Sequence, residues 1–159
     1  KFHWKLPIFV ARQIIRHRSF SFQEFSQRYQ DITVIQEAPV LREARTQDKK
    51  NRQNSNETDD QNIKDAWYEL QQITWATAIC NYKKAIELGV AKEQARALLP
   101  EGMTKTIMYM NGNIRSWIHY INMRSANGTQ KEHQEIAIAA KNIFAEHLPN
   151  VAKAAFCKN

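Results

Sequence analysis

Basic side chains gather between Arg12 and Tyr29, where the sequence reads RQIIRHRSFSFQEFSQRY. The stretch holds four arginines, one histidine, three serines and a single acid, Glu24. Guanidinium groups bind phosphate oxygens through paired hydrogen bonds, and serine hydroxyls supply further donors. These residue types therefore indicate recognition of phosphates and rings. Glu24 is either a simple charge partner for the arginines or an acceptor for a ribose hydroxyl or a base.

A second basic set lies in the later segment NIRSWIHYINMR, which has helical spacing. It contains Arg115, His119 and Arg124, with Asn113 and Asn122 beside them. Arg115 and Arg124 are nine residues apart, and at about 100° per residue they point to nearly opposite sides of a helix. One isolated pocket could hardly use both arginines, whereas an oligomer with shared sites would use each of them.

The formal charge of +7 is uneven, because residues 1–30 hold six Lys or Arg against Glu24 alone. Such a balance favours binding to polyanions, whether nucleic acid, nucleotides or phosphorylated cofactors. Other chemistries lack their motifs. No glycine-rich phosphate loop is present, no serine occupies a nucleophile elbow, and the five histidines are not paired at zinc spacing, so we predict no metal site.

Cysteine chemistry is also disfavoured by the two cysteines of the chain, Cys80 and Cys157, which have no ligand spacing. Cys80 lies in a helical pattern, where we expect a buried core thiol. This cysteine usage is typical of a reducing compartment. There is no apolar run of about 18 residues and no visible signal peptide, so we predict a cytoplasmic protein with no membrane partner.

The elements that must position these residues begin with a strand. The 159 residues fit one domain, and alternating apolar side chains predict a strand over residues 2–8. Pro7 suits the first turn of a helix that reaches Arg18, and an extended segment is expected over 19–37. Residues 38–61 are polar and almost without apolar side chains. This composition fits a solvated linker and a binding loop or lid equally well.

The clearest predicted element is a long amphipathic helix that ends at Gly89, whose aromatic residues serve core or subunit packing. Its expected buried stripe is Ile63, Ala66 or Trp67, Leu70, Ile73, Ala76, Ile79 or Cys80, Lys84 or Ala85, and Leu88. Further helices are predicted over 91–99, 113–125 and 129–148, with a short one after Pro149. Residues 103–112 favour a strand, so the sum is an α+β fold dominated by helices.

One motif in the basic stretch resembles that of the flavin-dependent thymidylate synthases: Arg-His-Arg at 16–18, then seven residues, then Ser26, followed by Arg28 and Tyr29. LPIFVARQIIRHR before it, ARALLP at 95–100, NGNIRSWIHYINMR at 111–124 and TQKEHQEIA at 129–137 also follow the family's order and spacing. The resemblance implies a helix-rich α+β fold with a small, mostly antiparallel sheet. It also implies a single catalytic domain over residues 1–159 that lacks an N-terminal segment of the full domain.

The resemblance further implies an activity, the reductive methylation of dUMP to dTMP without a cysteine nucleophile. Methylenetetrahydrofolate would give the carbon, and NADPH would give electrons through a non-covalent FAD. Family members are homotetramers whose active sites are assembled from several subunits, so one helix can serve two sites. Partners would be dUMP, folate and NADPH, with no nucleic acid and no membrane.

The motif matches transfer roles residue by residue. The residues that would hold dUMP are Gln13, Arg16, Glu24, Phe25, Ser26, Gln27, Arg28, Arg96 and Arg124. The residues that would hold FAD are Arg16, His17, Arg18, Glu24, Asn113, Arg115 and His119, although a relative often carries Asn where His119 stands. Arg124 matches the catalytic arginine that polarises the uracil ring, where a fixed guanidinium would stabilise the negative charge that develops.

Two other functions compete with the synthase. Aromatic residues beside arginines, as at Phe20, Phe22 and Phe25, and a basic polar loop also suit a nucleic-acid-binding module. A catalytically inactive relative that keeps the fold is the second alternative, disfavoured because the motif residues are all present. The segment 38–61 would close over folate or NADPH, or would simply be mobile.

Overall fold

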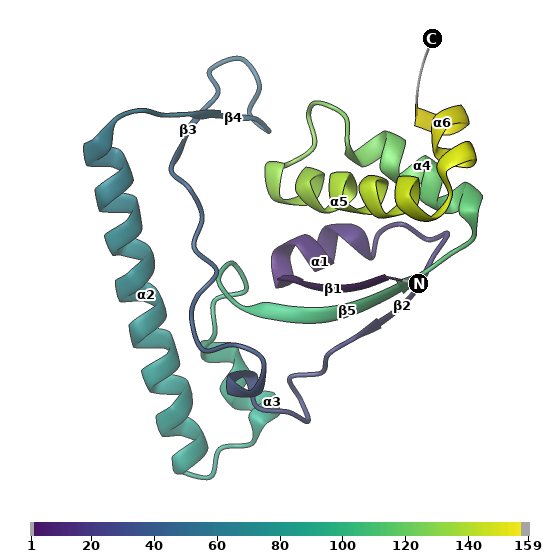
Figure 1. Cartoon of the computed structure of the whole chain (residues 1–159). Coiled ribbons are helices and arrows are strands. Elements are labelled where there is room, and N and C mark those ends of the chain that lie inside the picture. The colour runs from purple at the N-terminus through teal and green to yellow at the C-terminus, as the bar shows by residue number, and fades with distance from the viewer. Residues whose placement is uncertain (1, 157–159) are drawn as a thin grey trace.

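Three antiparallel strands form the sheet at the centre of the computed structural model, which describes residues 2–156 (Figure 1). The central strand is β5 (Lys105–Asn111), with β1 (Phe2–Pro7) on one side and β2 (Ser21–Glu24) on the other. The register pairs Leu6 with Thr106 and Glu24 with Met108. Both outer strands run antiparallel to β5, so the expected small antiparallel sheet is confirmed.

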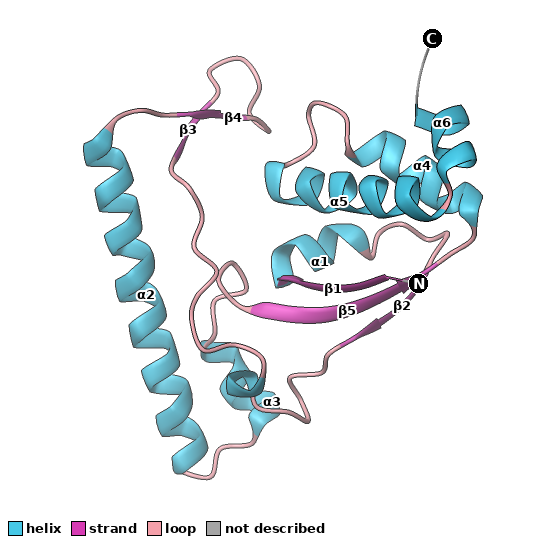
Figure 2. Ribbon diagram, viewed as in Figure 1, coloured by secondary structure: helices cyan, strands magenta, loops and turns pink. Residues whose placement is uncertain are grey.

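Four helices cover one face of this sheet and enclose the main core. Figure 2 shows α1 (Ile8–Ile14) between the strands and α5 (Lys131–His147), with α4 (Ile114–Arg124) and α6 (Pro149–Phe156) beside α5. Alternate residues of β5 turn toward these helices, because side chains on a strand point to opposite faces in turn. The core side chains include Val10, Ile14, Met108, Met110, Trp117, Tyr120, Ile121, Ala137 and Phe144. The helix-rich α+β class is therefore confirmed.

The long predicted helix exists as α2 (Gln61–Glu87), and Asp60 caps its N-terminus by accepting from the backbone N–H groups of Asn62 and Ile63. Its C-terminus ends at Gly89, whose φ of 82° is the left-handed conformation that glycine adopts without strain. The predicted buried stripe is right only toward the end of the helix, where Ala85 is buried and Ile79 packs against the core, and is wrong for the first half. Leu70 is 59% exposed and Ile73 is 57% exposed.

The buried face of α2 carries Gln71, Trp75, Tyr82 and Ala85, of which only Ala85 belongs to the predicted stripe. It packs on α3 (Lys92–Ala95) and the 3-10 turn η2 (Arg96–Leu98), in a second core with Ile32, Ala95 and Leu99. Burial of the face with Trp75 and Tyr82 is favoured because large aromatic side chains bury the most apolar area. Cys80 lies on the other side and is exposed, so the expected core thiol is wrong, and Cys157 lies outside the described residues.

The polar segment 38–61 is not a plain linker, because it folds into a hairpin of β3 (Arg45–Gln47) and β4 (Ser55–Glu57). Ion pairs fasten the hairpin to the start of α5. Arg45 pairs with Glu132 and with Glu43, and Lys131 Nζ lies 2.7 Å from Glu43 and 2.9 Å from Glu57. Such a network orients a surface segment even where each exposed pair adds little to stability.

The turn after α1 corrects a further expectation. The helix ends at Ile14, since the N–H of His17 donates to the carbonyl of Ile14 and closes a tight turn. Arg16 therefore lies beyond the end of the helix, and Arg12 within it pairs with Glu101 at 2.5 Å. The extended conformation predicted for residues 19–37 is found in β2. It is not found in η1 (Ile32–Val34), which is a 3-10 turn capped by Asp31.

No helix within residues 2–156 combines the length and the apolar character that a bilayer crossing requires.

Candidate functional site

An open cleft of 610 Å³ lies beside β2 and contains five of the predicted nucleotide-binding residues. The backbone N–H of Phe25 donates to the carbonyl of Ile107 at 2.8 Å, which holds the motif segment along β5. The 3-10 turn η2 brings Arg96 to the same cleft. The lining residues are Ile8, Arg12, Glu24, Phe25, Ser26, Gln27, Glu93, Arg96, Ala97, Leu99, Glu101, Thr104 and Thr106.

The charges of this cleft are only partly paired. Arg12 is bound by Glu101, and the hydrogen bond and charge of that carboxylate raise the pKa of Arg12. Arg28 Nη2 lies 3.3 Å from Glu93, at the edge of the cleft. The Arg96 Nε donates to the backbone carbonyl of Glu93, and its guanidinium forms no ion pair among residues 2–156. Arg96 is therefore free to bind an anion.

Gln27 supplies a second indication that the cleft binds something. Its amide nitrogen Nε2 is buried, yet it has no hydrogen-bond partner among the described residues. A buried polar group without a partner costs about 1–3 kcal/mol, so such groups are usually satisfied by a ligand, water or another chain. An unpaired amide donor, a serine hydroxyl and a free guanidinium in one cleft suit an anionic, ring-bearing ligand.

A second cluster forms around Arg124, at the last turn of α4. The Arg124 Nε donates to the His17 Nε2 at 3.0 Å, which makes that nitrogen an acceptor and leaves the His17 ring neutral. Burial lowers the pKa of His17, and the nearby charges of Arg124 and His119 lower it further. The predicted nucleotide-binding residue Gln13 lies in this second cluster and does not line the cleft.

Sequence reasoning missed His133, which is fully buried and joins this cluster from α5. Its Nε2 lies 3.1 Å from the Tyr120 hydroxyl, and its Nδ1 lies 3.1 Å from the Gln13 Oε1. The available signal was its position on the apolar face of α5, in step with Ala137, Ala140 and Phe144. Burial lowers the pKa of His133 to about 4, with the charge of Arg124 acting in the same direction.

This low pKa predicts an acid-sensitive fold. As pH falls below about 6.5, an unfolded chain protonates His133 while the folded chain does not, so stability is lost between about pH 7 and pH 4. Between pH 7 and pH 5 the loss attributable to this group is about 2 kcal/mol. Urea unfolding of His133→Asn, which cannot titrate, should show a pH dependence smaller by that amount. Equal pH dependence in both proteins would refute the assignment.

The remaining predicted residues form an exposed basic surface. Arg16, Arg18 and Arg115 are exposed and form no ion pair with any acid in the described part of the chain. The Asn113 Oδ1 caps α4 by accepting from the backbone N–H and the hydroxyl of Ser116, which leaves its amide donors available. His119 is also exposed.

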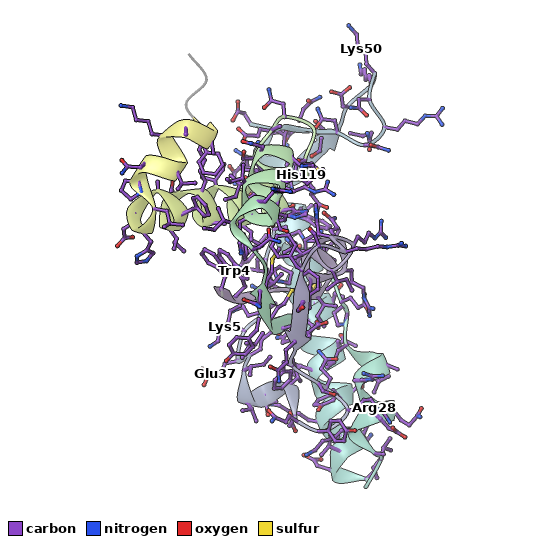
Figure 3. All side chains as sticks on the ribbon, turned by 90° about the vertical axis from the view of Figure 1, so that its right-hand side faces the viewer. Trp4, Lys5, Arg28, Glu37, Lys50 and His119 are labelled. Carbon is purple, nitrogen blue, oxygen red and sulfur yellow. The ribbon has the colours of Figure 1, made fainter. Side chains whose placement is uncertain are left out.

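The predicted nucleotide and flavin residues do not all meet in one chain. Figure 3 shows Arg28 and His119 well apart, with His119 in the upper part of the view and Arg28 near its lower end. The cleft holds Glu24, Phe25, Ser26, Gln27 and Arg96, and Arg28 borders it. The second cluster holds Gln13, His17 and Arg124. The arrangement therefore offers two incomplete sets of ligand-binding groups.

A family model described as "Thymidylate synthase complementing protein" matches residues 1–150. A "Probable flavin-dependent thymidylate synthase" from Paramecium bursaria Chlorella virus 1 is 49% identical over 145 residues, or 91% of this chain and 65% of that protein. The "Flavin-dependent thymidylate synthase" of Synechocystis sp. has the same identity and coverage. The chain thus spans about 65% of the length of these relatives.

Two solved structures have the same fold. The UMP/dUMP methylase PolB from Streptomyces cacaoi, bound with 5-Br UMP, matches with a TM-score of 0.77 and 24% identity over 96% of this chain and 71% of that chain. The structure bound with 5-Br dUMP gives a TM-score of 0.78 and 23% identity, over 97% and 70% of the two chains. At these identities the likeness establishes the arrangement of helices around a small antiparallel sheet.

Proposed function

Because the chain belongs to the thymidylate synthase complementing protein family, we propose that the protein is a flavin-dependent thymidylate synthase. The proposed reaction is the reductive methylation of dUMP to dTMP, with methylenetetrahydrofolate as carbon donor and NADPH as electron source. The observation that carries this proposal is the cleft beside β2. There the motif residues Glu24 to Gln27 meet Arg96, with an unpaired amide donor and an unpaired guanidinium. The proposed location is the cytoplasm.

The nucleotide occupies the cleft in this proposal. Arg96 and Arg28 neutralise the phosphate, and the Ser26 hydroxyl adds a hydrogen bond, because a phosphate oxygen accepts strongly from charged and hydroxyl donors. Glu24 accepts from the sugar, and Phe25 and Gln27 complete the walls. Gln13 and Arg124 act on the same nucleotide from the second cluster, contributed by another copy of the chain. Arg16, next to His17 in the sequence, acts on it from the exposed basic surface.

Arg124 is the proposed catalytic residue. Methylation at the uracil ring builds negative charge around N3 and the carbonyls, and a guanidinium held in place stabilises that charge. Two observations support this role. The Arg124 side chain is half-buried, and its Nε is already fixed by the bond to His17, so its Nη donors are oriented before the nucleotide arrives.

FAD would be held by Arg16, His17, Arg18, Glu24, Asn113, Arg115 and His119. The three arginines are exposed and unpaired within residues 2–156, which suits a cofactor that carries a pyrophosphate. The neutral His17 ring keeps an Nδ1–H donor that has no partner in the described region. When bound, FAD supplies the hydride-transfer chemistry that links NADPH to the carbon fragment.

A homotetramer with shared active sites is the proposed assembly. It would bring the cleft of one copy to the Arg124 cluster of another, since Arg124, His17 and Gln13 do not line the cleft of their own chain. The exposed stripe of α2 supports it, since Ile63, Trp67, Leu70 and Ile73 remain open to solvent on one helix. Exposed apolar patches of this kind are typical of protein–protein contacts.

Assembly through α2 predicts that Leu70→Glu separates the subunits. Burying an unpaired carboxylate at an apolar contact is costly, so association should weaken on the order of 100-fold. Light scattering on the purified protein measures the mass. Ile138→Glu is the matched control, because Ile138 is apolar and 42% exposed but lies on α5. An unchanged mass for Leu70→Glu would contradict the proposed role of α2.

The nucleic-acid-binding alternative has weaker support. Arg12, Arg28 and Arg45 are each paired with a carboxylate, so fewer basic side chains remain for a phosphate backbone than the sequence offers. The unpaired groups converge on a cleft, and no observation on the structure favours an extended strand. We therefore propose no nucleic acid and no membrane among the partners.

Two measurements on one sample test the function. The purified protein should be yellow, with a flavin absorbance spectrum, and should oxidise NADPH faster when dUMP is present. Deoxyuridine, which lacks the phosphate, is the matched control and should leave the rate unchanged. NADPH oxidation that does not respond to dUMP, in protein that holds FAD, would exclude dUMP as the substrate.

A further inference from the structure

Four side chains form a continuous hydrogen-bonded chain between α4, α1 and α5. They are Tyr120, His133, Gln13 and Gln130, joined by contacts of 3.1, 3.1 and 2.6 Å. His133 and Tyr120 are fully buried, whereas Gln13 is half-buried and Gln130 lines an open cleft of 670 Å³. The chain therefore runs from the protein core to a surface that a ligand can reach.

The directions of the bonds in this chain are linked to one another. The Gln13 Oε1 is an acceptor, so the His133 Nδ1 must carry the hydrogen and donate it. A neutral ring then has a bare Nε2, which accepts from the Tyr120 hydroxyl. The Gln13 Nε2 donates in turn to the Gln130 Oε1. All four side chains are satisfied only in this orientation or in its complete reversal.

The structure has the first of these two directions, with the Gln13 Oε1 toward His133 and the Gln13 Nε2 toward Gln130. In that direction the Tyr120 hydroxyl donates to the His133 Nε2. The His133 Nδ1 then carries the hydrogen and donates it to the Gln13 Oε1, which fixes the orientation of the Gln13 amide.

We propose that His133 is a positioning residue, which holds the Gln13 amide with its NH₂ group outward and thereby makes the site select uracil over cytosine. This inference rests on the proposed function, in which Gln13 contacts the nucleotide. Uracil presents carbonyl acceptors, whereas cytosine replaces one of them with an amino donor. One Gln13 hydrogen is taken by Gln130, and the other is free to donate to a carbonyl but not to an amino group. A Gln13 amide that could flip would offer its oxygen to cytosine.

A pair of substitutions separates the two ring nitrogens of His133. An asparagine amide nitrogen occupies the place of Nδ1, so His133→Asn keeps the donor to Gln13 and loses the acceptor for Tyr120. A glutamine amide reaches the place of Nε2, so His133→Gln keeps the acceptor for Tyr120 and loses the donor to Gln13. Each variant leaves one partner unsatisfied, so each should lower the melting temperature, and His133→Asn should lower it more because Tyr120 is fully buried and Gln13 is half-buried.

The test is the ratio of dCMP to dUMP dissociation constants, measured by calorimetry on the FAD-loaded protein. We expect His133→Asn to keep the wild-type ratio and His133→Gln to lower it by about tenfold, the value of one ordinary hydrogen bond. Equal ratios in the two variants would overturn the inference. Wild-type protein that binds no dUMP would overturn the proposed function together with it.

Tyr120→Phe gives an independent reading should either His133 variant fail to fold. It keeps the aromatic packing but removes the hydroxyl that fixes the His133 tautomer, so Gln13 is released to flip. The dCMP to dUMP ratio should fall by about threefold to tenfold. A ratio equal to that of the wild type in this variant would also overturn the inference.

Discussion

Arg124→Ala is expected to lower the rate of dTMP formation by about 10²–10³, the usual cost of removing one preorganised donor from a reacting centre. The loss should fall mainly on kcat, because the guanidinium stabilises charge that develops only as the uracil ring reacts. Arg124 is placed for this by the last turn of α4 and by the bond from its Nε to His17. Initial rates of dTMP formation at saturating dUMP measure the effect.

Arg124→Lys is the matched control for charge. Lysine keeps a positive charge but cannot hold the His17 ring and the nucleotide in one planar arrangement, so it should restore only a small part of the rate. FAD content should change only slightly in both variants, because Arg124 touches the proposed flavin residues only through His17, one of seven. A normal kcat with a raised KM in Arg124→Ala would show that this residue binds dUMP without stabilising the transition state.

Arg96→Ala is expected to raise the dissociation constant for dUMP by about 10- to 100-fold. A hydrogen bond between charged groups contributes about 1.5–3 kcal/mol, and each 1.4 kcal/mol corresponds to a factor of ten. Arg96 has no carboxylate partner among the described residues, so its charge is available to the phosphate. Calorimetric titration with dUMP measures the change.

Arg12→Ala is the matched control for Arg96, since both arginines line the same cleft. Arg12 is already neutralised by Glu101, so its removal should change dUMP affinity by less than about threefold. Deoxyuridine should bind the wild type and Arg96→Ala equally, because it has no phosphate. A larger effect for Arg12→Ala than for Arg96→Ala would show that the phosphate lies beside Arg12, which contradicts its proposed place beside Arg96.

Local chemistry explains which parts of the fold were predictable. Gly89 ends α2 as expected because a left-handed residue is the usual helix stop, and Asn113 starts α4 because its short side chain caps the first turn. The buried face of α2 was mispredicted because apolar residues occupy two faces of that helix. Periodicity identifies such faces but does not say which one the chain covers itself and which it leaves to a partner.

In the candidate site, too, some residues could be grouped from the sequence and others could not. Glu24 to Gln27 could be grouped from the sequence because they are consecutive and follow one strand. The contact between His17 and Arg124 joins residues that are 107 positions apart, and no spacing rule reports such a pair. His133 was missed because a lone histidine in an amphipathic helix resembles any surface histidine until its neighbours are known.

The central claim is that two separated sets of side chains form one site for dUMP. It is tested most directly by the release of tritium from dUMP labelled at C5, in the presence of FAD, NADPH and methylenetetrahydrofolate. We expect release in the wild type and a loss of at least about 100-fold in Arg124→Ala. Wild-type protein that binds FAD and dUMP but releases no tritium would contradict it.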